Sequence, residues 1–206
     1  MSKSRTTKPD LTRLLELQRL LQQFNSVDRV VHRQHGKTVR HENDTEHSYN
    51  LAMTAWFLAP HFPHLDANLI IRYALVHDLV EVHAGDTYVY ADAARLSTKA
   101  EREAAAAKQL VEDWADFPDM HHLIEGYESR STAEAKFVYA LDKIMPILQI
   151  YIHDGYTWQQ EGITLEQLHA IKIDKVAVSP EITPFYNEIY ALLSQSPHLI
   201  PQDSGG

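Results

Sequence analysis

The sequence predicts an all-α protein, folded as a single domain of many packed helices. Apolar residues recur mainly at the three- and four-residue spacing of amphipathic helices, whereas the two-residue alternation of half-buried strands is scarce. A capping-box pattern, which marks the start of a helix, occurs at Thr98 with Glu101, at Ser131 with Glu134, and at Thr164 with Gln167. The length of 206 residues suits one large core. Strands are therefore expected to be short or absent.

The N-terminal segment is expected to hold one helix followed by a loop. Leucines at helical spacing predict the helix between residues 11 and 21, behind a flexible N-terminus of residues 1–9. Residues 25–44 are polar and basic and include Gly36, so this stretch is expected to be mostly loop.

Two further helices follow, and their ends are marked by residues that begin or stop a helix. The second helix is expected to begin near Asp44 and to end at Pro60, because proline interrupts a helix. The third is expected to begin after the N-cap Asp66 and to continue without a break to Gly85, a residue type that commonly ends helices. Residues 86–97 are then expected to be irregular.

The C-terminal half is predicted to be helical almost throughout. The alanine run at 104–107 strongly favours a helix, and Pro118 suits the first turn of the next one. The capping boxes at Ser131 and Thr164 predict two more helices, and Pro180 is expected to open the last.

Composition narrows the classes of protein that the chain can be. The content of 44% apolar and 23% charged residues is typical of a soluble globular protein. The folded domain is expected over residues 10–195, followed by a tail of residues 196–206. The formal net charge of -9 argues against broad affinity for nucleic acid or anionic membranes. The absence of cysteine excludes disulfides and thiolate metal sites. No stretch has the length and apolar character of a membrane span or a signal region, so a cytoplasmic protein is expected.

The segment ALVHDLVEVHAGD, residues 74–86, places several ionisable groups at the end of an apolar helix. His77 and Glu81 are four residues apart, so they are expected on one face of the helix, with Asp78 beside His77. Taken alone, this pattern is typical of a solvated helix end. Its interpretation therefore depends on partners elsewhere in the chain.

Two other predicted helices offer such partners. His47 lies where the apolar face of the second helix begins, and Asp142 lies in ALDKIMP with apolar neighbours on its own face. A buried carboxylate without a partner is costly, so Asp142 is expected to face another group. Two imidazoles and two carboxylates suit one divalent transition metal ion, Mn, Co, Fe, Ni or Zn, and leave positions open for water and substrate. The sequence thus predicts a metal site of His47, His77, Asp78 and Asp142.

These motifs, in this order, resemble the HD superfamily of metal-dependent phosphohydrolases. The H…HD…D pattern of that superfamily is matched by His47, by His77 with Asp78, and by Asp142. The motifs that flank it are ENDTEHS at 42–48, HDLVE at 77–81, AGD at 84–86 and ALDK at 140–143. The resemblance is greatest to the 5'-deoxynucleotidase branch, the YfbR-like and HD domain-containing protein 2-like proteins. It implies an all-α HD domain with the metal site between helices.

The resemblance also implies roles for three more residues. Glu81 and Asp86 match the catalytic carboxylates that position or deprotonate the attacking water and protonate the leaving oxygen, and which residue has which role stays open. Arg29 matches the arginine that holds the substrate phosphate. A tryptophan that follows this arginine in some deoxynucleotidases is Val30 here, so base and sugar preference also stay open.

The implied activity is metal-dependent hydrolysis of a (deoxy)nucleoside 5'-monophosphate to nucleoside and phosphate, by a homodimer. One alternative is another HD reaction, on a cyclic nucleotide or a nucleoside polyphosphate. Val82 follows Glu81 where guanosine tetraphosphate hydrolases usually carry a second acid, which argues against that class. A second alternative is a non-catalytic helical binding module that keeps its metal site. The presence of Glu81, Asp86 and Arg29 favours an enzyme.

Basic residues near these motifs are expected to be solvated. Lys143 is adjacent to Asp142 but is expected to project elsewhere. Lys37 and Arg40 add positive charge before the second helix and are expected on the surface.

Aromatic residues are expected in two settings. Tyr88 and Tyr90 follow Asp86 and are candidates for the wall of a substrate pocket. Trp56 and Trp114 are expected in the core.

Overall fold

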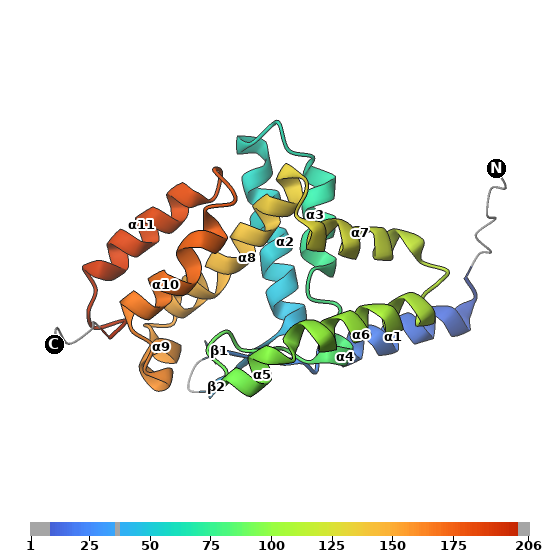
Figure 1. Ribbon diagram of the computed structural model, residues 1–206, viewed down its shortest axis with the longest axis horizontal. Coiled ribbons are helices and arrows are strands. Elements are labelled where there is room, and N and C mark those ends of the chain that lie inside the picture. The colour runs from blue at the N-terminus through green and yellow to red at the C-terminus, as the bar shows by residue number, and fades with distance from the viewer. Residues whose placement is uncertain (1–8, 36–37, 202–206) are drawn as a thin grey trace.

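The computed structural model describes residues 9–35 and 38–201, which are mainly helical with one β-hairpin (Figure 1). The hairpin consists of β1 (Asp28–His35) and β2 (Thr38–Asn43). The helices are α1 (Leu11–Phe24), α2 (Asp44–Leu58), the 3-10 helix η1 (Ala59–His61), α3 (Ala67–Val76), α4 (Glu81–Ala84), α5 (Ala93–Ser97), α6 (Lys99–Asp113), α7 (Pro118–Ser129), α8 (Ala133–Ile152), α9 (Tyr156–Glu161), α10 (Leu165–Val176) and α11 (Thr183–Ser194). The predicted all-α fold class is confirmed. The expectations for the flexible N-terminus before Pro9, for Gly36 and Lys37, and for the tail beyond Pro201 lie outside the described residues.

Helix α8 forms the centre of the fold. It packs against α2, α3 and α7 on one side and against α9, α10 and α11 on the other (Figure 1). A second, smaller core lies between α1, α6 and α7, where Leu20, Leu110 and Trp114 are buried together. Leu79 and Val80 belong to this second core, whereas Ala74 belongs to the first. The segment around His77 therefore lies where the two cores meet.

Substitution of Phe137 on α8 measures how much the first, larger core contributes to stability. Its side chain is fully buried and its ring meets Phe62 edge-on, with ring centroids 5.8 Å apart. Phe137→Ala is expected to lower the free energy of unfolding by about 3–5 kcal/mol, because it removes apolar contacts and leaves a cavity. Chemical denaturation measures this change. Lys136→Ala, an exposed neighbour on the same helix, is the control and is expected to change little.

The prediction of mostly loop for residues 25–44 is wrong, because this stretch forms the antiparallel hairpin. His32 pairs with His41 and Arg33 with Arg40 across the two strands. In β2 the one buried residue is the acidic Glu42, so the strand lacks the apolar alternation that would have predicted it. The hairpin leads directly into α2, whose N-cap Asn43 completes a capping box with Glu46.

The prediction of one unbroken helix from Asp66 to Gly85 is also wrong. Asp66 caps α3 as expected, but the regular helix ends at Val76 and resumes at Glu81. Between them the backbone makes tighter turns, in which Glu81 N–H donates to the Asp78 carbonyl at 2.8 Å. His77 and Glu81 therefore do not share one regular helix face.

Several helix starts differ from the expected positions. Residues 93–97 form the short helix α5, so the segment 86–97 is only partly irregular. Thr98 makes no capping bond, because its hydroxyl instead donates to carbonyls of α5. Thr132, one residue after Ser131, caps α8, and α11 begins at Thr183 rather than at Pro180.

Other helix starts are confirmed. Pro118 lies in the first turn of α7, and Thr164 and Gln167 form the predicted capping box of α10.

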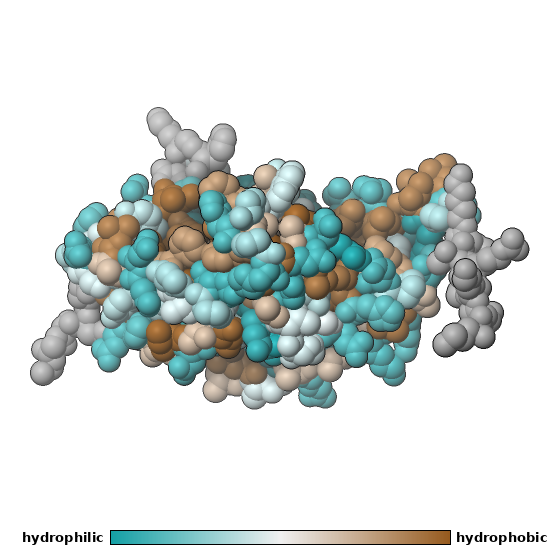
Figure 2. Space-filling model, turned by 90° about the horizontal axis from the view of Figure 1, so that it is seen from above, coloured by the Kyte–Doolittle hydropathy of each residue, from teal (hydrophilic) through white to brown (hydrophobic). Residues whose placement is uncertain are grey.

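The surface carries separate apolar patches between polar side chains, as the face in Figure 2 shows. Trp114 is buried as predicted, but the prediction for Trp56 is wrong: it is 59% exposed on α2. Helix α2 packs against the rest of the fold through its other face, and that leaves Trp56 outside. Among the described helices, none combines the length and apolar character that a membrane span would need.

Candidate metal centre and substrate pocket

The structure brings His47, His77, Asp78 and Asp142 together. His47 comes from the first turn of α2, Asp142 from the middle of α8, and His77 and Asp78 from the turn after α3. His47 Nε2 lies 2.9 Å from Asp142 Oδ1, and His77 Nε2 lies 2.9 Å from Asp78 Oδ2. One ligand atom from each of the four residues lies within 4.8 Å of the others. These are the four residues that the sequence predicts as a metal site.

The histidine rings are held so that their Nε2 atoms face the carboxylates. His77 Nδ1 donates to the carbonyl of Ala74 at 2.9 Å, so Nε2 is the ring nitrogen that faces the carboxylates and that a metal ion would bind in place of a proton. His47 Nδ1 lies 3.7 Å from an oxygen of Glu42, which is fully buried on β2. A histidine with a carboxylate or carbonyl behind it is the usual arrangement around a protein-bound metal ion.

The charges at this cluster fit a divalent cation. Burial disfavours the charged form of His77, but Asp78 and Asp142 outweigh that effect and raise its pKa to about 10. Without a metal, the imidazolium thus serves as the positive charge between the two carboxylates. Burial and the nearby Arg29 lower the pKa of His47 to about 4, so this ring is neutral at pH 7, as a metal ligand must be. His77 Nε2 has no hydrogen-bond partner of suitable geometry.

Glu81 and Asp86 lie beside the cluster and line the same pocket. Burial, followed by the charges of Asp78 and Asp86, raises the pKa of Glu81 to about 11. The pKa of Asp86 is also raised, chiefly by burial, although a hydrogen bond from Glu81 opposes the shift. Glu81 is thus protonated at pH 7, and its hydroxyl donates a hydrogen bond to the Asp86 carboxylate. A protonated carboxyl group beside an ionised one can supply both an acid and a base for catalysis.

Gly85 makes it possible for Asp86 to face the pocket. Its φ of 71° with ψ of 147° is a conformation that glycine alone adopts readily. Two arginines then fix the loop: Arg95 donates to the Asp86 carbonyl at 3.3 Å, and Arg102 donates to the Ala84 carbonyl at 2.7 Å and to the Thr87 hydroxyl at 2.8 Å. The predicted function of Gly85 as the helix end is confirmed.

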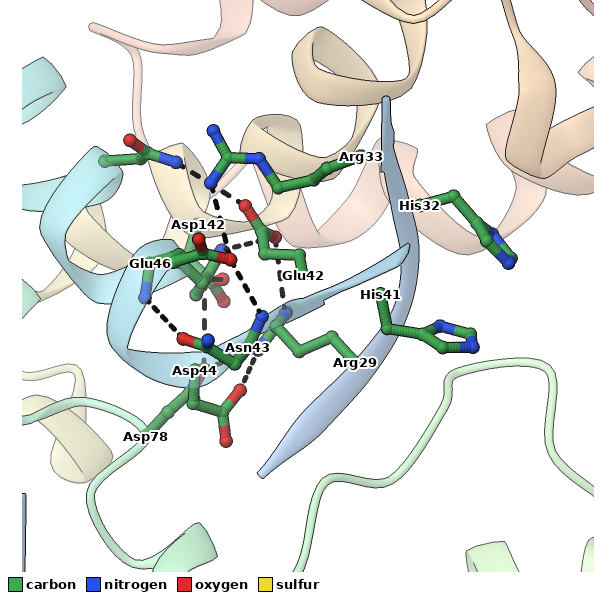
Figure 3. Close-up of polar contacts among 12 residues, drawn as sticks. Arg29, His32, Arg33, His41, Glu42, Asn43, Asp44, Glu46, Asp78 and Asp142 are labelled. Atoms are coloured by element: carbon green, nitrogen blue, oxygen red, sulfur yellow. Dashed lines mark hydrogen bonds and ion pairs between the residues drawn. The ribbon is translucent and has the colours of Figure 1, made fainter. Parts of the chain in front are cut away.

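Arg29 projects from β1 into a group of carboxylates (Figure 3). Its Nη1 donates to Asp44 Oδ1 and to Asp78 Oδ2, each at 2.9 Å, and its Nε lies 3.8 Å from Glu42 Oε2. Its side chain is 12% exposed and lines the pocket described below. Arg29 is therefore at the site, as predicted, but its charge is already shared with acidic residues.

Three further side chains of the hairpin, Arg40, His32 and His41, lie outside this group of carboxylates. Arg40 forms an exposed bidentate pair with Glu46, which confirms its predicted place on the surface. His32 and His41 point away from the acidic cluster (Figure 3), and His32 contacts the Thr157 hydroxyl.

A pocket of about 260 Å³ opens beside the cluster. One end is formed by Arg29, Asp78, Glu81, Asp86 and Asp142. The walls toward the other end are mainly apolar or aromatic: Tyr88, Tyr90, Pro146, Ile147, Ile150, Trp158 and Leu168. Tyr88 and Tyr90 thus line the pocket wall, as the sequence suggested.

Four groups at the site are not predicted by the sequence motifs. Lys143 does not project elsewhere: its long side chain folds back, and its Nζ lies 2.5 Å from Asp142 Oδ2. Asp44 is buried, and burial together with Asp78 raises its pKa to about 7. Asp44, Asp78 and Glu81 also lie close enough to one another to share a cation, although Arg29 already bonds to the first two.

Lys172 and Lys175 of α10 are the other missed groups, and both line the pocket. No sequence motif marks them, because their place depends on how α10 packs against α8.

Comparison with known proteins agrees with this geometry. The chain is 37% identical over 140 residues to a 5'-deoxynucleotidase HDDC2 of Bos taurus, and 35% identical over 140 residues to that of Homo sapiens. The alignments cover 66% of this chain, and they span 65% and 66% of the two relatives. The chain thus matches slightly less than two thirds of the length of these relatives.

A solved structure and a family model match more of the chain. The crystal structure of a predicted metal-dependent phosphohydrolase from Magnetospirillum magnetotacticum superposes with a TM-score of 0.76 at 27% identity, over 92% of this chain and 96% of that one. The model of the HD domain matches residues 21–183, which include every residue of the cluster. The chain belongs to the HD domain family.

Proposed function

We propose that this protein is a metal-dependent phosphohydrolase that converts a nucleoside 5'-monophosphate, in particular a deoxynucleotide, to nucleoside and phosphate. The observation that carries the proposal is the meeting of two imidazoles and two carboxylates from separate segments, at the end of a pocket that also holds Glu81, Asp86 and Arg29. The names of the HDDC2 relatives support the substrate class.

His47, His77, Asp78 and Asp142 would hold one divalent transition metal ion, which supplies a water of lowered pKa when bound. Its identity among Mn, Co, Fe, Ni and Zn stays a prediction, since availability affects it as much as ligand type.

The protein's own groups would carry the remaining steps of the hydrolysis. Arg29 would orient the phosphate and offset its charge. One carboxyl group of the Glu81–Asp86 pair would accept the proton of the attacking water, and the other would donate a proton to the leaving 5' oxygen. The hydrogen bond between Glu81 and Asp86 is consistent with one acid and one base.

The apolar part of the pocket would hold the nucleoside. Trp158, Ile150 and Leu168 offer flat or aliphatic surface, and Tyr88 and Tyr90 add aromatic rings 5.4 Å apart. Pockets that bind small molecules typically combine such walls with a few polar groups at one end.

Phosphate release tests the activity. Protein stripped of metal would be reloaded singly with Mn, Co, Ni or Zn and supplied with deoxynucleoside and nucleoside 5'-monophosphates, a cyclic nucleotide and a nucleoside triphosphate. We expect release from the monophosphates, and none from metal-free protein. Failure of every metal with every substrate would contradict the proposal and favour a binding module.

We further propose that two copies associate through the outer face of α2. Tyr49, Met53, Trp56 and Phe57 are exposed there at helical spacing, and Phe57 is 74% exposed. Large apolar side chains gathered on one face commonly mark protein contacts. The double variant Trp56→Glu, Phe57→Glu is therefore expected to sediment as a monomer where the wild-type protein sediments as a dimer.

Leu11→Glu is the matched control, because Leu11 is 71% exposed on α1 and lies on a different helix. This variant is expected to remain dimeric. A monomeric wild-type protein, or a dimer that survives both glutamates on α2, would refute this interface. A cytoplasmic location also stays a prediction, which cell fractionation would test.

A further inference from the structure

The pocket has a second group of positive charges on the wall formed by α8, α10 and the start of α6. Lys143 comes from α8, Lys172 and Lys175 come from α10, and Lys99 comes from α6. All four line the same pocket as Arg29. In a chain with a formal net charge of -9, so many lysines around one pocket call for a physical explanation.

Three of the five cations at the pocket already have acidic partners. Arg29 bonds to Asp44 and Asp78, Lys143 contacts Asp142, and Lys99 lies 3.3 Å from Glu103. Lys172 and Lys175 differ, because neither has an ion pair or hydrogen bond among the described residues. These two lysines are therefore the cations that remain available to a ligand.

Lys172 is the more unusual of the two. Its residue is 7% exposed and no carboxylate lies within ion-pair distance of it among the described residues, so a charged ammonium there has little water and no acidic partner. Burial and the repulsion of Lys143 lower its pKa to about 7, while the charge of Asp142 opposes this shift. Such a group is costly for the folded protein, and a bound anion would remove that cost.

The position of Lys172 indicates which anion. Lys172 lines the same pocket as Asp142, Lys143 and Arg29, and its helix α10 packs directly against α8, which carries Asp142 and Lys143. Leu168, one turn earlier on α10, belongs to the apolar end. An anion that contacts Lys172 would therefore lie in the pocket that also holds Asp142 and Arg29.

We propose that Lys172, with Lys175 beside it, forms an anion site that binds the phosphate oxygens of the substrate in the same pocket as Arg29. The inference rests on the proposed function and adds residues that no motif of the family marks in this sequence. Lysine ammonium groups bind phosphate well as point charges, and two of them without partners complement a dianion.

Calorimetric titration of the Mn-loaded protein tests the site. The ligands are inorganic phosphate, deoxyadenosine 5'-monophosphate and deoxyadenosine, so that the phosphate and nucleoside contributions separate. Lys172→Met is expected to weaken both phosphate-bearing ligands by about tenfold or more, because each loses a charged hydrogen bond, and to leave deoxyadenosine unchanged. Lys172→Arg is expected to retain most of the affinity. Lys136→Met, on the exposed face of α8, is the control.

Thermal melting of the same variants separates binding from structure. Because Lys172 is buried without a partner, Lys172→Met is expected to melt at the wild-type temperature or above it. Unchanged phosphate affinity, equal loss for deoxyadenosine, or a variant that fails to fold would each overturn the proposal. If wild-type protein binds phosphate but hydrolyses no phosphoester, the proposed function is wrong. The binding data for the Lys172 variants then still decide whether the anion site exists.

Discussion

Asp78→Ala is expected to abolish metal binding and, with it, phosphate release. Asp78 lies between His77 and Arg29, and its oxygen also lies 3.8 Å from His47 Nε2. Removing the partner of a metal ligand commonly costs about 10–100-fold in metal affinity, and removal of a ligand itself should cost more. Elemental analysis of protein dialysed against limiting Mn would show about one ion per chain in the wild type and almost none in the variant.

His47→Ala provides an independent test, because His47 belongs to a different helix and has no bond to Arg29. It is expected to lose the metal as well. Asp174→Ala is the control, since Asp174 is exposed on α10. Full metal occupancy in both the Asp78 and His47 variants would show that the cation binds elsewhere.

Glu81→Gln is expected to leave a folded, metal-loaded protein with little activity. Glutamine keeps the shape of the side chain but can no longer exchange a proton with Asp86 or with water. Loss of a general acid or base typically lowers the rate by about 10²–10⁴-fold, so kcat should fall by that factor while metal content is unchanged. Ordinary turnover would remove Glu81 from the mechanism.

In the metal-free protein, the stability of the same variant is expected to depend on pH differently from that of the wild type. Burial raises the pKa of Glu81 from 4.5 to about 11, so at intermediate pH the folded chain holds a proton that the unfolded chain has released. The contribution of Glu81 to the free energy of unfolding of the wild-type protein is therefore expected to fall as the pH rises from 4.5 to about 11. Glutamine does not titrate, so Glu81→Gln should become progressively more stable than wild type as pH increases. A difference that stays constant with pH would contradict the buried, protonated state of Glu81.

Sequence reasoning succeeded where short-range signals and residue chemistry were sufficient. The caps at Asp66 and Thr164 are local hydrogen bonds, and the sequence predicts them directly. The apolar neighbours of Asp142 predict that its side chain faces the interior, and the side chain is buried in the structure. The sequence predicts one site from the histidines and aspartates because three predicted helices each offer ligands that would be costly to bury alone.

The errors arose where tertiary contacts decide the outcome. The hairpin was missed because its buried residue in β2 is Glu42, whose burial is explained by Arg29 and His47 rather than by strand periodicity. The break after Val76 could not be predicted from periodicity, since Leu79 and Val80 pack into a different core from Ala74. Lys172 is separated from Asp142 by 30 positions, and only the packing of α10 on α8 brings it to the pocket.

The most direct test of the account is to locate the metal by anomalous diffraction from crystals of the Mn-loaded protein. We predict a strong peak at about 2.0–2.2 Å from one atom each of His47, His77, Asp78 and Asp142, at the end of the pocket that holds Glu81 and Asp86. A peak bound by Asp44, Asp78 and Glu81 without either histidine, or no peak near Asp142, would contradict it.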